Sequence, residues 1–294
     1  MGHYPVMLSE VLEHLNIQDG GHYLDATFGG GGYTQSILDK KLCTVSAIDR
    51  DADAQKRSRE LSDIYKERFN FYLNTFSEIG NFFNPGTFDG IVFDFGVSSF
   101  QLDTADRGFS FRLDGPLDMR MSKESSISAY DVVNGYSKDN LADIIYHYGD
   151  EPLSRKIASA IVRHRDSKKI ETTSELAEII RGVSSRRRDH DPATLTFQAL
   201  RIFVNDELSE IDKGVRSAIN LLRPGGRIVV VSFHSLEDRI CKEIFKHPSF
   251  QDGSIKLKPI TKKALSPSKI EIKENARSRS ARLRCVEITK EPNV

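Results

Sequence analysis

The first hundred residues alternate short apolar runs with segments of helical periodicity. The apolar runs lie at residues 22–26, 43–48, 69–73 and 88–93. Residues 33–40 and the polar stretch 51–65 between these runs suit helices. Strands that alternate with helices in this way form parallel sheets with helices on both faces. The pattern therefore predicts an α/β, doubly wound, mostly parallel sheet.

The alternation stops near residue 125, and the following hundred residues have almost entirely helical periodicity. Helices are predicted at 139–147, at 151–165, from Thr173, and as one long segment at 193–210 that follows Pro192. The apolar run 227–232 marks the return of a central buried strand. Two extended stretches, 254–260 and 281–289, predict an antiparallel hairpin that closes the sheet.

An interruption of this length matches a domain of its own. We therefore predict that residues 1–105 and 206–294 form the doubly wound domain. Residues 106–205 are predicted to form an inserted all-helical domain.

Four consecutive glycines, residues 29–32, lie where the first strand turns into a helix, the place where backbone approaches a nucleotide closely. A tight strand–helix connection is the simpler explanation, but it does not need four glycines. The dinucleotide fingerprint GxGxxG is broken, because its sixth position is Thr34. No Gly-Lys-Ser/Thr follows, so a Walker loop is absent as well. This leaves a nucleoside cofactor without a pyrophosphate, with S-adenosylmethionine as the leading candidate.

Asp49 ends the second strand, twenty residues after Gly29. A carboxylate there can accept hydrogen bonds from the ribose hydroxyls of an adenosine. It can equally be an ordinary residue at the end of a strand. The glycines and the acid together favour the cofactor interpretation.

The fourth strand ends at Asp94 and is followed by a polar motif that contains Ser98 and Ser99. In a doubly wound sheet this edge borders the cofactor crevice. Methyltransferases that act on an exocyclic amine place a short polar motif here. The lone pair of a cytosine amine is delocalised into the ring, and hydrogen-bond acceptors beside a carboxylate localise it and help to remove the proton. Asp94, Ser98 and Ser99 are therefore the candidate catalytic residues.

The composition, with 38% hydrophobic and 29% charged residues among 294, is that of a globular protein. No apolar run reaches the ~18 to 20 residues that a membrane span needs. The N-terminal residues lack the layout of a signal peptide. Three distant cysteines form neither a CxxC motif nor a disulfide framework, so a cytoplasmic location is expected, with no structural zinc.

The net charge of zero hides an uneven distribution. Residues 256–284 hold ten Lys and Arg against two acids, a local charge of +8, so the rest of the chain carries −8. A second basic group consists of Arg181, Arg186, Arg187 and Arg188. Segregated positive charge suits contact with a phosphate backbone, although a solvated face or a loose tail is an equal alternative.

Long motifs spread over nearly the whole chain resemble the bacterial ribosomal RNA small subunit methyltransferase H family. In the first half they are DATFGGGG at 25–32, DFGVSSFQ at 94–101 and RGFSFRLDGPLDMRM at 107–121. In the second half they are PAT at 192–194, TFQALRI at 196–202, VNDEL at 204–208, SFHSLEDR at 232–239 and NARSRSARLR at 275–284.

The resemblance implies a class I methyltransferase fold and methyl transfer from S-adenosylmethionine to N4 of a cytidine in the decoding region (P-site) of 16S ribosomal RNA. The partner would be that RNA in the small ribosomal subunit, with the helical insertion recognising the substrate. Neither a metal nor a membrane is implied, and a monomer and a homodimer both remain open. The implied cofactor contacts are Gly31, Gly32, Tyr33, Asp49, Phe76, Asp94 and Gln101. The candidate RNA contacts are Arg112, Arg277, Arg279, Arg282 and His234.

Two positions depart from the family pattern. The family usually has His where this chain has Tyr33, and Arg where it has Leu195. Tyr33 can still offer its backbone amide and a ring contact, whereas Leu195 removes a positive charge near the expected RNA face.

Other functions remain as alternatives. A dinucleotide enzyme is disfavoured by Thr34, and a non-catalytic ribosome-assembly factor would be expected to lose Asp94 or the glycines. His234 and Ser235 are not accompanied by a GxSxG motif, so a hydrolase is disfavoured. Methylation at cytosine C5 would need a cysteine near the fourth strand, where Ser98 and Ser99 stand instead.

Overall fold

The computed structural model describes residues 5–122, 125–183, 191–246, 249–250 and 255–289. The chain forms two compact units, one made of Met1–Gly96 and Leu208–Val294 and the other of Val97–Glu207. The predicted domain limits, 1–105 with 206–294 and 106–205, stay a prediction, because compactness does not test whether either part folds alone. Of the second basic group, Arg186, Arg187 and Arg188 lie outside the described residues.

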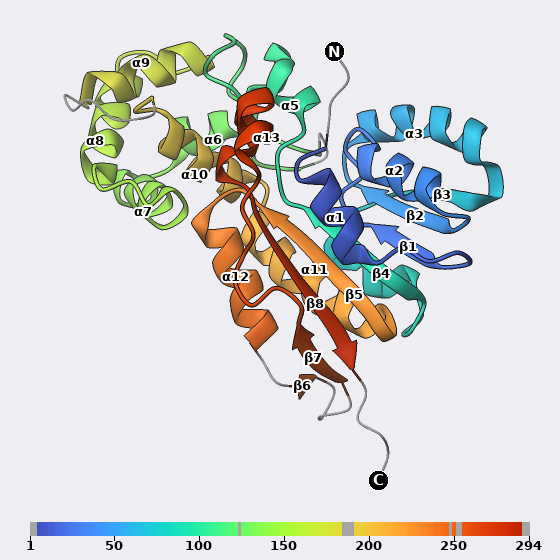
Figure 1. Ribbon diagram of the computed structural model, residues 1–294. Coiled ribbons are helices and arrows are strands. Elements are labelled where there is room, and N and C mark those ends of the chain that lie inside the picture. Colours follow the sequence, from blue (N-terminus) through green and yellow to red (C-terminus); the bar gives the residue numbers. More distant parts are fainter. Residues whose placement is uncertain (1–4, 123–124, 184–190, 247–248, 251–254, 290–294) are drawn as a thin grey trace. The chain divides into compact units, whose positions relative to one another are not determined.

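The first unit is built on a sheet whose eight described strands run in the order β3-β2-β1-β4-β5-β8-β7-β6 (Figure 1). The parallel strands are β1 (His22–Asp25), β2 (Thr44–Asp49), β3 (Phe69–Leu73), β4 (Phe88–Asp94) and β5 (Leu222–Ser232). The antiparallel strands are β8 (Arg282–Thr289), β7 (Ile255–Pro259) and β6 (Ser249–Phe250). The predicted α/β, doubly wound, mostly parallel sheet and its antiparallel closure are confirmed.

Helices cover both faces of this sheet. On one face lie α1 (Leu8–Leu15), α2 (Gly32–Lys40) and α3 (Ala52–Tyr65), packed with Val229 and Val231 of β5. On the other lie α4 (Ile79–Phe82), α11 (Glu207–Leu221) and α12 (Ser235–Lys246), packed with Ile228 and Val230. Because successive residues of a strand point to opposite faces, a strand covered on both sides needs an unbroken apolar run.

The sequence pattern did not predict α1, and its start depends on a distant contact. Met7 precedes the helix with a positive φ of 52°, and its N–H donates to Glu271 Oε1 at 2.7 Å. Glu271 belongs to α13 (Lys269–Glu274), which precedes the 3₁₀ turn η4 (Ala276–Ser280). Two further 3₁₀ turns of this unit are η1 (Lys66–Arg68) and η2 (Phe76–Glu78).

The second unit is helical, as predicted. Its described elements are α5 (Ser99–Asp103), η3 (Ala105–Arg107), α6 (Ala129–Gly135), α7 (Lys138–Gly149), α8 (Ser154–Arg165), α9 (Thr173–Val183) and α10 (Thr194–Val204). Their apolar faces share one core, which includes Ile145, Ile161, Ile180 and Leu200. Across the described residues of both units, no helix is long and apolar enough to cross a bilayer.

The single long helix predicted at 193–210 is wrong. The structure has two helices, α10 and α11, with a break at Asn205 and Asp206, where φ of Asp206 is 48°. The buried Asn205 side chain explains the break. It donates to the Met119 carbonyl at 2.8 Å and accepts from the Met121 N–H at 2.7 Å. These bonds hold residues 119–121 against the end of α10, directly before the positive φ of Asp206.

Candidate active site

The glycine loop connects β1 to α2 in a conformation that only glycine adopts easily. Gly29 and Gly31 have φ of 53° and 77°. A Cβ atom on Gly31 would lie 2.6 Å from Leu61 and 2.8 Å from Phe28, and one on Gly32 would lie 2.3 Å from Pro5. The loop is thus closely packed against these side chains, and no side chain caps α2 at Gly31. This leaves the first amides of α2 without a capping side chain, an arrangement that suits a polar ligand.

Asp49 is tied to this loop. Its Oδ2 accepts from the Gly29 N–H at 2.7 Å, and its Oδ1 accepts from the Asp51 N–H at 2.8 Å. Burial raises the pKa of Asp49, while these two hydrogen bonds act in the opposite direction. A carboxylate has about four lone-pair sites. Asp49 therefore retains acceptor capacity for ribose hydroxyls while it also fixes the loop.

Asp94 ends β4, and its carboxyl group lies half-buried at the same edge of the sheet. Its own N–H donates to Thr27 Oγ1 at 2.7 Å, and its Oδ1 accepts from the Gly96 N–H at 3.0 Å. Burial raises the pKa of Asp94 to about 7, and the nearby acids Asp25 and Glu237 act in the same direction. A carboxyl group with this pKa can both take up and release a proton near neutral pH.

Asp25 is a buried acid that the sequence analysis did not single out. It accepts from Thr34 Oγ1 at 2.7 Å and from the Thr27 N–H at 3.2 Å. Burial raises its pKa to about 6. Since Thr27 also binds the backbone of Asp94, one threonine links the ends of β1 and β4. The signal available in the sequence was an acid at the end of an apolar strand, directly before the glycines.

Tyr33 is buried against this group of acids. Its hydroxyl donates to the Val6 carbonyl and also interacts with Asp94. Burial holds the pKa of Tyr33 well above its ordinary value. The side chain therefore joins the N-terminal segment to the end of β4. This structural function is separate from the cofactor contact that is predicted for Tyr33.

Phe76 lies in η2 and belongs to an aromatic group. Its ring centroid is 5.7 Å from that of Phe93 and 6.0 Å from that of Phe95. Gly214 of α11 leaves room for it, since a Cβ there would lie 2.5 Å from the ring. Phe76 is only half-buried, so part of the ring stays accessible for an adenine.

Ser98 and Gln101 lie in the helical unit and hold each other in a capping box at the start of α5. Ser98 Oγ accepts from the Gln101 N–H at 3.3 Å, and Gln101 Oε1 accepts from the Ser98 N–H at 3.2 Å. Both side chains thus have a local structural function. Ser99 is the first residue of α5, and Arg112 of the same unit is exposed.

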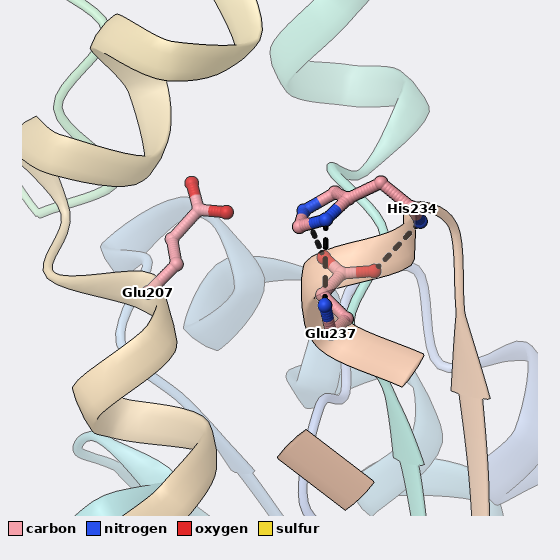
Figure 2. Close-up of side chains that lie close together, drawn as sticks. All are labelled: Glu207, His234 and Glu237. Atoms are coloured by element: carbon pink, nitrogen blue, oxygen red, sulfur yellow. Dashed lines mark hydrogen bonds and ion pairs between the residues drawn. The ribbon is translucent and has the colours of Figure 1, made fainter. Parts of the chain in front are cut away.

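His234 and Glu237 stand together at the start of α12, where Figure 2 shows the ring beside the carboxylate. His234 Nε2 is 2.9 Å from Glu237 Oε1, and Glu237 Oε2 accepts from the Phe233 N–H at 2.6 Å. The two side chains are 9% and 1% exposed. Glu237 lies against the His234 ring and was missed in the sequence because it reads as an ordinary residue of a helix.

The basic segment, residues 256–284, presents three of its predicted RNA contacts to solvent. Arg277 and Arg279 lie in η4, which Asn275 caps at 3.2 Å, and Arg282 begins β8. All three residues are exposed. Arg284 is different, because it forms an ion pair with Asp238 at 2.7 Å.

The chain is similar to known proteins over nearly its whole length. The chain is 53% identical to "Ribosomal RNA small subunit methyltransferase H" of Ehrlichia canis over 293 residues, which are 97% of this chain and 99% of the relative. It is 50% identical to the protein of the same name from Neorickettsia sennetsu, with 97% and 95% covered. A solved rRNA methylase from Streptococcus thermophilus is far more distant, with 12% identity and a TM-score of 0.43 over 99% of each chain, and adds nothing to the assignment.

The sheet order, with β8 antiparallel beside β5, is that of the class I methyltransferase fold, as expected. The MraW methylase family matches residues 1–289, nearly the whole chain. This chain belongs to the MraW methylase family.

Proposed function

We propose that this protein methylates N4 of a cytidine in the decoding region (P-site) of 16S ribosomal RNA, within the small ribosomal subunit in the cytoplasm. The methyl donor is S-adenosylmethionine, on which the family depends. The names of the relatives support ribosomal RNA as the substrate. The observation that carries the proposal is the group of Asp25, Asp49 and Asp94 at the carboxyl ends of β1, β2 and β4, beside the glycine loop.

The residues at this edge fit an adenosine cofactor. The loop carries no side chains because it consists of glycines, which the positive φ values at Gly29 and Gly31 favour. Asp49 offers its remaining lone pairs to ribose hydroxyls. Phe76 offers an apolar wall to the adenine. Gly31, Gly32, Tyr33 and Gln101 complete the proposed cofactor contacts. When bound, S-adenosylmethionine supplies an electrophilic methyl group on a sulfonium.

Asp94 is the proposed acceptor of the proton that the cytidine amine loses. A cytosine amine is a poor nucleophile, and a carboxylate that accepts its hydrogen localises the lone pair as the new bond to carbon forms. The raised pKa of Asp94, about 7, makes the carboxylate a better base than an ordinary aspartate. Ser98 and Ser99 remain proposed contacts of the amine.

The RNA is proposed to bind through its phosphates. Arg277, Arg279 and Arg282 expose positive charge on the basic segment, and Arg112 does so in the helical unit. His234, which lies beside Glu237, is proposed to contact the target nucleotide.

The main alternative is an assembly factor that keeps the fold without catalysing methylation. Purified small subunits from cells that lack the gene distinguish the two. Incubation with the protein and S-adenosylmethionine should add one methyl group to one cytidine, and mass analysis of the decoding-region fragment with and without the gene locates it. Binding to subunits without methyl transfer would favour the alternative. A methyl group on carbon rather than on N4 would overturn the assigned chemistry.

A further inference from the structure

Three cations gather on α8 beside the end of α9, two helices that pack together in the helical unit (Figure 1). They line a pocket of about 480 Å³ whose walls are Arg155, Lys156, Ser159, Arg163, Gly182 and Val183. None of the lining residues that the structure describes is acidic. The pocket therefore concentrates positive charge at a place that the sequence motifs do not mark.

The spacing along α8 explains why these side chains meet. Arg155, Ser159 and Arg163 recur every four residues, and Lys156 follows directly after the first, so all four share one face of the helix. The opposite face, with Ile157 and Ile161, is buried in the core of the unit. The cations are exposed, so a large polymeric ligand can reach them from solvent.

Several other cations of this unit have carboxylate partners. Three arginines form ion pairs at 2.7–2.8 Å: Arg120 with Asp118, Arg181 with Asp191, and Arg201 with Glu207. In the part of the chain that the structure describes, no ion pair joins Arg155, Lys156 or Arg163 to an acid. Three like charges without counter-charges repel one another, and an anion bound between them would remove this repulsion.

We propose that this pocket binds phosphate groups of the RNA backbone, an additional contact that rests on the proposed function and extends it. Arginine suits the task because its planar guanidinium donates two parallel hydrogen bonds to phosphate oxygens, and lysine adds a point charge. Ser159 Oγ already donates to the Arg155 carbonyl at 2.8 Å, so recognition depends on the cations. The contact is to phosphates and carries no sequence preference.

A purely structural explanation predicts a different result. Gly182 and Val183 belong to the last turn of α9, and cations near the C-terminal end of a helix stabilise it through the helix dipole. In that case loss of the cations lowers the melting temperature and leaves RNA affinity unchanged.

The test replaces Arg155, Lys156 and Arg163 together with Gln. Affinity for a 16S decoding-region RNA and for small subunits should fall by tenfold or more at moderate salt. The slope of log K against log salt should decrease by about 2 to 3, since each phosphate contact contributes about 0.7 to 0.9. The melting temperature and the affinity for S-adenosylmethionine should not change. The matched control replaces Lys40, Lys56 and Arg59, three exposed cations of the first unit, with Gln.

A second pair of variants keeps the test decisive if the triple variant fails to fold. Lys156→Glu places one negative charge in the pocket and should weaken RNA binding several-fold, whereas Lys56→Glu should not. Arg155→Lys with Arg163→Lys keeps the charge and should bind the RNA nearly as tightly as the unaltered protein.

The outcomes separate this proposal from the proposed function. If the unaltered protein neither binds nor methylates the RNA, the proposed function fails. If it does both and the triple variant binds like the control, only the pocket assignment fails. Weaker binding to subunits with unchanged binding to naked RNA would mean that the pocket contacts a ribosomal protein, which also overturns the assignment.

Discussion

At the scale of single residues, the carboxyl group of Asp94 decides between two functions, because it can anchor the cofactor or accept the amine proton. Asp94→Asn keeps the size of the side chain and removes its charge. If Asp94 accepts the proton, single-turnover methylation at saturating S-adenosylmethionine should slow by ~100-fold or more, the usual effect of a positioned acid or base. Recovery of most of the rate at saturation would show that Asp94 only binds the cofactor. Asp103→Asn, on the exposed surface of α5, is the control.

The raised pKa of Asp94 gives the same residue a pH signature. The carboxylate is the basic form, so the methylation rate should rise as the pH increases towards about 7 and become constant above it. An ordinary aspartate would place this rise several units lower. Single-turnover rates between pH 5.5 and 8.5 measure it, and the slope below pH 7 should disappear in Asp94→Asn. A flat profile in the unaltered protein would contradict the assignment of Asp94 as the base.

Asp49 carries a prediction about cofactor affinity. Asp49→Ala removes the proposed ribose contact and also the bond that holds the Gly29 N–H, so S-adenosylmethionine should bind more weakly by ~1.5 to 3 kcal/mol. Titration calorimetry measures the loss, with Asp53→Ala as the control because Asp53 lies in the next helix and forms an ion pair with Lys56 at the surface. Unchanged affinity in a folded Asp49→Ala protein would remove Asp49 from the site.

Residues at strand ends show what the sequence can and cannot reveal. The places of Asp49 and Asp94 at strand ends were predictable, because each is a carboxylate at the end of an apolar run, whereas their functions stay a prediction. Asp25 follows the same rule, yet its importance depends on Thr34 turning back to it from α2, which no local pattern reveals. Glu237 likewise gains its function only from the fold of the turn before α12, where it meets His234.

At the scale of elements, the strands were predictable and two helix ends were not. Parallel strands covered on both faces require continuous apolar runs, so the run at residues 228–231 predicts a buried central strand. The start of α1 depends instead on Glu271, which is 264 residues away from Met7. The break between α10 and α11 depends on Asn205, whose partners lie more than eighty residues earlier. Periodicity continues across such a break and cannot detect it.

The break between α10 and α11 carries a stability prediction. Asn205→Ala would leave the Met121 N–H and the Met119 carbonyl without their partner in a buried place. The free energy of unfolding should decrease by about 1 to 3 kcal/mol, the cost of an unsatisfied buried polar group. Denaturant titration measures this, with the exposed Asn140→Ala as the control. Equal stability of the two variants would mean that the Asn205 bonds do not fix the break.

At the scale of the whole molecule, the distribution of charge along the chain says more about RNA binding than the net charge does. The basic segment carries +8 and the remainder of the chain −8. In the structure this segment exposes Arg277, Arg279 and Arg282, whereas Arg284 and Lys258 are held by Asp238 and Glu287. Charge counting could locate the segment, but only the fold shows that these three arginines are exposed.

The three exposed arginines therefore carry the last prediction. When Arg277, Arg279 and Arg282 are replaced together with Ala, RNA affinity should fall, and the salt dependence of binding should flatten by about 2 to 3 in the slope of log K against log salt. S-adenosylmethionine affinity should change much less with salt, because its binding neutralises few charges. Fluorescence titration of a decoding-region RNA at several salt concentrations measures the first effect, and calorimetry measures the second. The control is again the replacement of Lys40, Lys56 and Arg59, which removes the same charge from elsewhere on the first unit. If the control flattens the slope as much as the arginine variant, RNA responds only to total charge, and the basic segment is not its binding surface.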